Sequence, residues 1–141
     1  LDDATRFIAT MNHGYAGTRE LNEALVSRFM VIEMPSISIS NLKKLLRREF
    51  PYMRDEYILQ FAALFQDLQK KSENSEISTK SVDLRGLLSS IHLMEKNLEV
   101  FKALQMGITN KSFDSFEREL VEDVIRLRIP EKLEGSEIFT N

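Results

Sequence analysis

The sequence contains no cysteine, which excludes disulfide bridges, thiolate metal sites and cysteine nucleophiles. It also has only two histidines, too few to favour a catalytic zinc site. No apolar run approaches the ~18 residues that a membrane-spanning helix needs, and the first residues lack the basic-then-apolar pattern of a secretory signal. We therefore expect no bound metal, no membrane partner and a cytoplasmic location.

An excess of basic residues is also lacking. The chain has 19 Lys and Arg against 22 Asp and Glu, for a formal net charge of -3. A protein whose main task is to bind nucleic acid usually shows a clustered basic excess, so we do not expect a nucleic-acid partner. The length of 141 residues fits one domain, or a small domain with a piece of a second.

The first 35 residues have the pattern of two strands with a helix between them. Short apolar runs at residues 7–11 and 30–34 are bounded by turn residues or by Pro35, as buried strands are. Thr18 can cap a helix whose apolar residues share one face, namely Leu21, Ala24, Leu25 and Phe29. Two strands do not form a stable sheet alone, so we interpret residues 1–35 as a piece of a larger α/β sheet in a longer protein.

After Pro35 the apolar residues recur with a helical period. The predicted helices cover residues 40–50, 55–68, 84–95, 98–106 and 112–128. The fold class is therefore mainly α, with a helical bundle over residues 36–130 and a boundary at Pro35–Ser36. We expect a polar loop at 70–76 and a loosely held, flexible tail at 131–141.

Single residues mark the ends and faces of these helices. Ser40 or Asn41 is expected to begin the first helix, Gly107 to act as a C-cap and Ser112 as an N-cap. Two phenylalanine pairs at helical spacing, Phe61/Phe65 and Phe113/Phe116, are expected in the core. The acidic residues of the last helix, Glu117, Glu119 and Glu122, are expected to be solvated.

Three polar residues stand out by their positions. Asn12 follows the first predicted strand, and ligands of open α/β sheets bind at the carboxyl ends of strands. Arg28 precedes Phe29 at the start of the second strand, and Arg85 follows an Ile-Ser-Thr segment, residues 77–79, near the start of a helix.

With these motifs the sequence resembles the AAA+ ATPases, in particular the MoxR-like and midasin/dynein-related branch, over nearly the whole chain. The resemblance implies that residues 1–35 are the C-terminal piece of the α/β core and residues 36–130 its helical lid domain. It implies that Asn12 is the sensor-1 residue, Arg28 an arginine finger and Arg85 the sensor-2 residue. An arginine finger acting in trans can raise the rate of phosphoryl transfer by ~10³–10⁵.

The resemblance also implies ATP and Mg²⁺ as cofactors of the intact protein, a hexameric ring, and a protein client for which a von Willebrand factor A-type protein is the candidate. The chain departs from the family pattern at three places. The chain has neither a G-x-x-x-x-G-K-[ST] loop nor a strand ending in paired acidic residues, and His13 stands where many relatives have proline. We therefore expect this chain alone to hydrolyse no ATP and to bind no cofactor tightly.

Each assignment has an alternative. Asn12 could form an Asx turn, Arg28 could favour a helix C-terminus, and Arg85 could be solvated or paired with Asp83. A different class of function also fits, in which the helical bundle is a non-catalytic interaction module with vestigial nucleotide residues.

Overall fold

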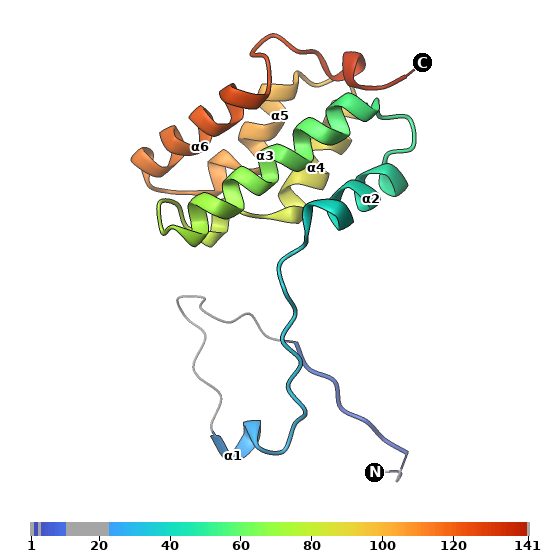
Figure 1. The fold of residues 1–141 in the computed structure, drawn as a ribbon, viewed down its shortest axis with the longest axis vertical. Helices are drawn as coiled ribbons and strands as arrows, with labels where there is room; N and C mark the ends of the chain where they lie inside the picture. The colour runs from blue at the N-terminus through green and yellow to red at the C-terminus, as the bar shows by residue number, and fades with distance from the viewer. Residues whose placement is uncertain (1, 3, 11–22, 141) are drawn as a thin grey trace. The chain divides into compact units, whose positions relative to one another are not determined.

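The computed structural model describes residues 2, 4–10 and 23–140, and the chain divides into two compact units, Leu1–Ser36 and Ile37–Asn141 (Figure 1). The division lies next to Pro35, where the apolar period of the sequence changes.

In the first unit, the described residues form a short helix and no β-strand. Helix α1 covers Glu23–Val26, and the predicted strands have no ladder at residues 7–10 or 30–34. The prediction of two strands is thus wrong for these residues. A strand is stabilised by pairing its N–H and C=O groups with a neighbour, and the described part of this unit offers none. Their apolar side chains are exposed, Ile8 to 93% and Met30 to 97%.

The second unit is the helical bundle that the periodicity predicts. Its α-helices are α2 (Ile39–Glu49), α3 (Asp55–Glu73), α4 (Leu84–Glu95), α5 (Val100–Gly107) and α6 (Ser115–Arg128). Three short 3-10 helices join or follow them, η1 (Thr79–Ser81), η2 (Thr109–Lys111) and η3 (Gly135–Ile138). Helix α3 contacts both α2 and α6, and α4 packs against α5 (Figure 1). Among the described helices, none is both long and apolar enough to cross a bilayer.

Helix boundaries differ from the expected ones where a better capping side chain lies nearby. Ser38 caps α2, its Oγ accepting from the backbone N–H of Asn41 at 3.3 Å. Asp114 rather than Ser112 caps α6, because its carboxylate accepts from the N–H of Glu117 at 2.9 Å. Helix α3 continues to Glu73, through most of the segment predicted as a loop.

The phenylalanine pairs are divided between core and surface. Phe61 and Phe65 are buried as predicted, but Phe113 is 87% exposed and Phe116 69% exposed. The second pair was therefore assigned wrongly. Phe116 lies nine residues before the fully buried Ile125, and nine steps of ~100° place two side chains on opposite sides of a helix.

The tail is packed on the bundle rather than loosely held. Leu133 is 7% exposed and Ile138 is fully buried. The backbone N–H of Val100 donates to the carbonyl of Leu133 at 2.9 Å, and that of Thr140 donates to the carbonyl of Tyr52 at 2.7 Å. A few apolar residues spaced along a polar segment are enough to hold it when backbone partners are available.

Helices α4 and α5 approach each other closely at two glycines, Gly86 and Gly107. A Cβ atom built on Gly86 would overlap the carbonyl oxygen of Gly107, and one built on Gly107 would overlap Ser90 Oγ. Ser90 Oγ lies 2.8 Å from the carbonyl oxygen of Gly86 and 2.9 Å from that of Ala103, so its hydroxyl links the two helices. Gly107 is the last residue of α5 and Ile108 the C-cap, so close packing explains this glycine better than the predicted C-cap.

Replacing Gly107 with alanine tests this contact. Helix propensity alone predicts a gain of up to about 1 kcal/mol, since alanine favours a helix over glycine. We expect instead a loss of about 1–3 kcal/mol in the free energy of unfolding in urea, because the methyl group meets backbone and a buried hydroxyl. Lys102→Ala, at an exposed position of the same helix, should change stability by no more than about 0.5 kcal/mol. A stabilised Gly107→Ala protein would contradict the close contact.

Candidate functional site around Arg85

Arg85 lies in the first turn of α4, at the end of the bundle that η1 and η2 also form. The turn is capped by Asp83, whose Oδ1 accepts from the backbone N–H of Arg85 at 3.0 Å. The side chain of Arg85 is exposed, and its guanidinium makes no hydrogen bond or ion pair with the residues that the structure describes. The capped first turn of α4 thus carries the guanidinium of Arg85, whose N–H donors, unpaired with any described residue, are all free to bind a ligand.

Lys111 holds the other oxygen of the capping carboxylate. Its Nζ donates to Asp83 Oδ2, across 28 residues of chain. A Cβ on Gly86 would lie 2.8 Å from that Nζ, so the missing side chain of Gly86 leaves room for the ammonium group. Burial raises the pKa of Asp83, but the hydrogen bond and charge of Lys111, together with the backbone N–H groups of Gly86 and Arg85, outweigh it, so the pKa is below the ordinary 3.8.

Glu117 fixes the segment that leads into α4. One of its carboxylate oxygens accepts from the N–H of Ser78 at 3.0 Å, from Ser78 Oγ at 2.7 Å and from Ser81 Oγ at 2.8 Å. Burial raises the pKa of Glu117, but these hydrogen bonds outweigh it and the pKa is below the ordinary 4.5. The expectation of a solvated side chain is therefore wrong for Glu117, because sequence spacing gives no sign of partners about 40 residues away.

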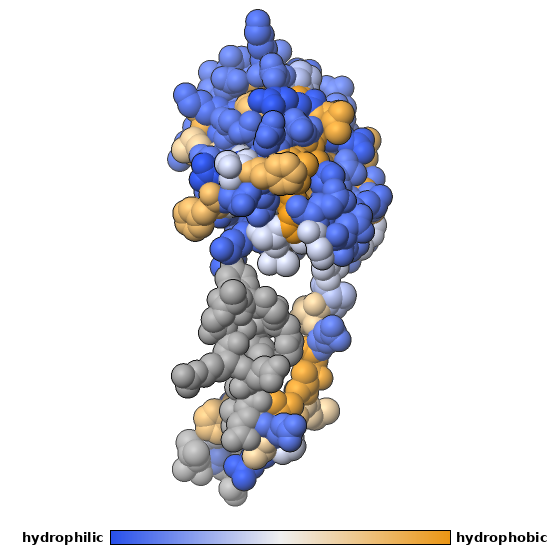
Figure 2. Space-filling view, turned by 90° about the vertical axis from the view of Figure 1, so that its left-hand side faces the viewer, coloured by the Kyte–Doolittle hydropathy of each residue, from blue (hydrophilic) through white to orange (hydrophobic). Residues whose placement is uncertain are grey.

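Aromatic side chains flank this end of the bundle. Phe113 precedes α6, and Lys80 Nζ lies 5.8 Å from the centre of its ring. Figure 2, viewed from the side where α6 begins in Figure 1, shows hydrophobic groups scattered among hydrophilic ones on unit 2. Phe116 and Leu127, both on α6, add to the exposed apolar surface of the bundle.

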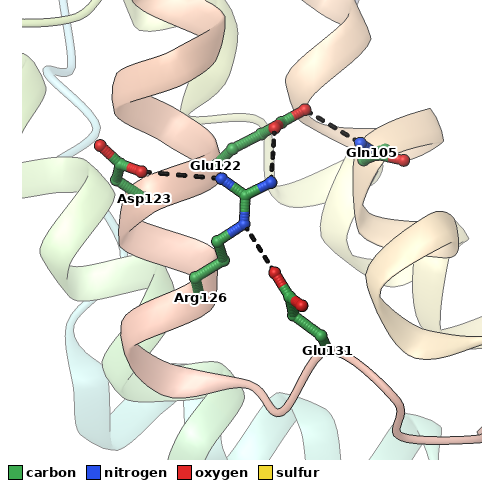
Figure 3. Close-up of polar contacts among 5 residues, drawn as sticks. All are labelled: Gln105, Glu122, Asp123, Arg126 and Glu131. Atoms are coloured by element: carbon green, nitrogen blue, oxygen red, sulfur yellow. Dashed lines mark hydrogen bonds and ion pairs between the residues drawn. The ribbon is translucent and has the colours of Figure 1, made fainter.

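A second polar cluster, centred on Arg126, is structural in its contacts (Figure 3). The guanidinium of Arg126 lies 3.3 Å from Glu122, 3.8 Å from Asp123 and 3.0 Å from Glu131. It also lies over the ring of Phe101 in α5, 5.3 Å from the ring centre. Glu122 also accepts from Gln105 of α5 at 2.9 Å. These bonds join α5, α6 and the tail, so Glu122 is likewise more than a solvated residue, whereas Glu119 is exposed as expected.

Of the other predicted site residues, Asn12 and His13 lie outside the described residues. Arg28 is exposed and follows the short helix α1 in the first unit. Arg28 and Arg85 thus belong to different units, each described separately. In the described part of the chain, no three His, Asp or Glu side chains are grouped to hold a metal ion.

Sequence reasoning missed Lys111, Ser78 and Ser81 as parts of the Arg85 environment. The serines belong to the Ile-Ser-Thr segment and to the residues just after it, which did mark the start of α4. Lys111 had no such local signal, because it reaches Asp83 only through the close contact of two helices.

Curated proteins similar to this chain are known from several bacteria. The chain is 32% identical over 117 residues to the uncharacterized protein YojN of Bacillus subtilis (strain 168). This match covers 83% of this chain and 38% of YojN. It is 30% identical over 120 residues to an uncharacterized protein of Staphylococcus haemolyticus and 31% identical over 120 residues to one of Staphylococcus aureus (strain USA300). Each of these matches covers 85% of this chain and 45% of the relative.

The chain thus spans less than half the length of these curated relatives, and their names assign no activity. No family model matches the sequence, and no solved structure matches it.

The Glu117 cluster predicts a pH-dependent stability difference between the wild type and Glu117→Gln. Because the folded pKa lies below the unfolded value near 4.5, the ionised carboxylate stabilises the fold above that pH and its contribution is lost as the pH falls through the folded pKa. We expect Glu117→Gln to lower the free energy of unfolding by about 1–2 kcal/mol at pH 7. The gap should shrink below pH 4.5.

Urea unfolding at several pH values measures both effects. Glu119→Gln, at an exposed position of the same helix, is the matched control and should follow the wild type throughout. A gap between the wild type and Glu117→Gln that stays constant down to pH 3 would show that the charge of Glu117 is not what the hydroxyl groups stabilise.

Proposed function

We propose that this chain is the C-terminal part of an AAA+ ATPase, in which the second unit is the lid domain and Arg85 contacts the phosphates of bound ATP. The single observation that carries the proposal is that the Arg85 side chain is exposed and, in the described part of the chain, unpaired. Its guanidinium is exposed in a well-capped first turn and has no partner among the described residues, although Asp83 is two residues away. A planar guanidinium can grip phosphate oxygens with two donors, which lysine does not reproduce.

The residues present fit part of an ATP site. Arg85 supplies a cation for phosphate oxygens, but the sequence contains no P-loop, and the described residues offer no acidic cluster for Mg²⁺. Under the proposal, the P-loop and the Mg²⁺ ligands belong to another part of a longer protein. The curated relatives, more than twice as long as the matched region, leave room for such a part.

The remaining roles follow from the same proposal. Arg28 acts as a finger on the ATP of a neighbouring subunit in a ring, and Asn12 orients the attacking water. Rotation of the lid reports the state of the nucleotide to a cytoplasmic protein client, for which a von Willebrand factor A-type domain is our candidate.

A non-catalytic interaction module is the second candidate function, and one observation favours it. Phe113 is 87% exposed and Leu127 is 83% exposed, on or beside α6. Large apolar side chains exposed at both ends of one helix offer contact points for another protein. This candidate needs no role for Arg85.

Substitution of Arg85 in the full-length protein separates the two candidates. If Arg85 contacts phosphate, Arg85→Ala should weaken the binding of a fluorescent ATP analogue by roughly 10- to 100-fold, the equivalent of one or two charge-assisted hydrogen bonds. Arg85→Lys should restore only part of the affinity, since a lysine cannot donate in a fork. The control is Arg48→Ala, which removes an exposed arginine of α2. Equal affinities of Arg85→Ala and Arg48→Ala would favour the interaction module.

Arg28 makes a different prediction. A finger that acts in trans is needed for hydrolysis rather than for binding, so Arg28→Ala should lower the steady-state ATPase rate of the full-length ring by about 10³ and leave nucleotide affinity nearly unchanged. Mixing Arg28→Ala subunits with subunits unable to bind ATP should restore some activity, because each kind supplies what the other lacks. Lost nucleotide binding in Arg28→Ala, or no recovery in the mixture, counts against the finger.

A further inference from the structure

The exposed state of Arg85 needs an explanation, because a carboxylate lies two residues before it. Asp83 is partly exposed and stays ionised, and an Arg–Asp pair at this spacing would leave the guanidinium unavailable to a ligand. In the structure each carboxylate oxygen accepts one hydrogen bond, and the ammonium group of Lys111 offsets the negative charge that would attract the guanidinium. Oδ1 accepts from the backbone N–H of Arg85 itself, and Oδ2 accepts from Lys111.

We propose that Lys111 is a positioning residue, which occupies Asp83 and thereby keeps the guanidinium of Arg85 free to meet an anion. This inference rests on the proposed function in one respect, that the anion is the phosphate of a nucleotide. The competition among Lys111, Asp83 and Arg85 is a property of the chain itself, and it is testable without a nucleotide.

The fold places Lys111 for this task. Helix α5 contacts α4 through Gly86 and Gly107, and η2 follows α5 directly, so Lys111 comes to lie over the first turn of α4. The backbone just after η2 is also fixed, because Arg118 Nε donates to the carbonyl of Ser112 at 2.6 Å. Lys111 therefore reaches Asp83 from a backbone that is fixed on both sides, whereas Arg85 reaches outward from an exposed position.

The size of the effect follows from exposure. The side chains of Lys111 and Asp83 are 38% and 32% exposed, so an ion pair at this place is partly screened by water. An exposed pair of this kind shifts an equilibrium by at most about fivefold. If Asp83 captures Arg85 once Lys111 is gone, the apparent affinity for an anion falls by the same factor, since only the uncaptured fraction binds.

The first test uses the 141-residue chain without nucleotide. Side-chain NMR of arginine follows the exchange of the Arg85 Nε–H with water, which is fast when the guanidinium is unpaired. We expect slower exchange in Lys111→Met and wild-type exchange in Lys111→Arg, which keeps a cation on Asp83. Adding Asp83→Asn to Lys111→Met should restore fast exchange, while asparagine still caps α4. Fast exchange in Lys111→Met, or slow exchange that Asp83→Asn does not reverse, overturns the inference.

The second test measures the affinity of the full-length protein for a fluorescent ATP analogue. Lys111→Met should weaken binding about two- to fivefold, and Asp83→Asn should restore it in that background. In an Arg85→Ala background, Lys111→Met should have no further effect, whereas a lysine that touched phosphate itself would still matter. Lys102→Met, at an exposed position of α5, should bind like the wild type. A similar loss with and without Arg85 overturns the inference.

The two tests separate the two proposals. If the NMR result is as expected but Arg85→Ala leaves nucleotide affinity unchanged, the positioning by Lys111 stands and the nucleotide role of Arg85 fails. If Arg85→Ala weakens binding but Lys111→Met changes neither exchange nor affinity, the proposed function stands and the positioning role fails.

Discussion

The close contact between Gly86 and Gly107 is the constraint on which the candidate site depends. The two helices approach closely because glycine stands on each of them at the contact, where it faces backbone or the small buried hydroxyl of Ser90 on the other helix. The contact sets where α5 ends relative to the first turn of α4, and so it sets where η2 and Lys111 lie. A larger residue at either position would separate the helices and withdraw Lys111 from Asp83.

Three carboxylates at this end of the bundle accept hydrogen bonds from groups within it. Glu117 is held by Ser78 and Ser81, and Asp114 accepts from the N–H of Glu117 as a cap. Asp83 is shared between Lys111 and a backbone N–H. These three carboxylates therefore have internal donors, and the exposed cation of Arg85 is left without a counter-ion among the described residues. Under the proposed function, that cation is the one that meets ATP.

The sequence predicted the helices of the bundle well because helical periodicity is local. The runs that define α3 and α4 place their buried residues, such as Phe61 and Leu87, on one face within a few turns. It failed for residues 7–10 and 30–34, because strand formation depends on a partner strand that the described residues do not supply. Phe113 and Phe116 show a second limit, since helical spacing marks a shared face without saying which face is covered.

In the candidate site, too, residues with a local sequence signal could be predicted and residues that act through distant contacts could not. Arg85 could be named from sequence because its signal, the Ile-Ser-Thr segment at residues 77–79, lies within a few positions of it. Lys111 and Glu117 could not, because each acts through a contact with residues 28 to 39 positions away.

A short-range pattern thus singles out Arg85, whereas the residues that surround it are set by packing. The same reasoning explains why an arginine beside an aspartate is ambiguous in a sequence. Whether the two pair depends on a third residue that only the fold brings to the carboxylate, and here that residue is Lys111.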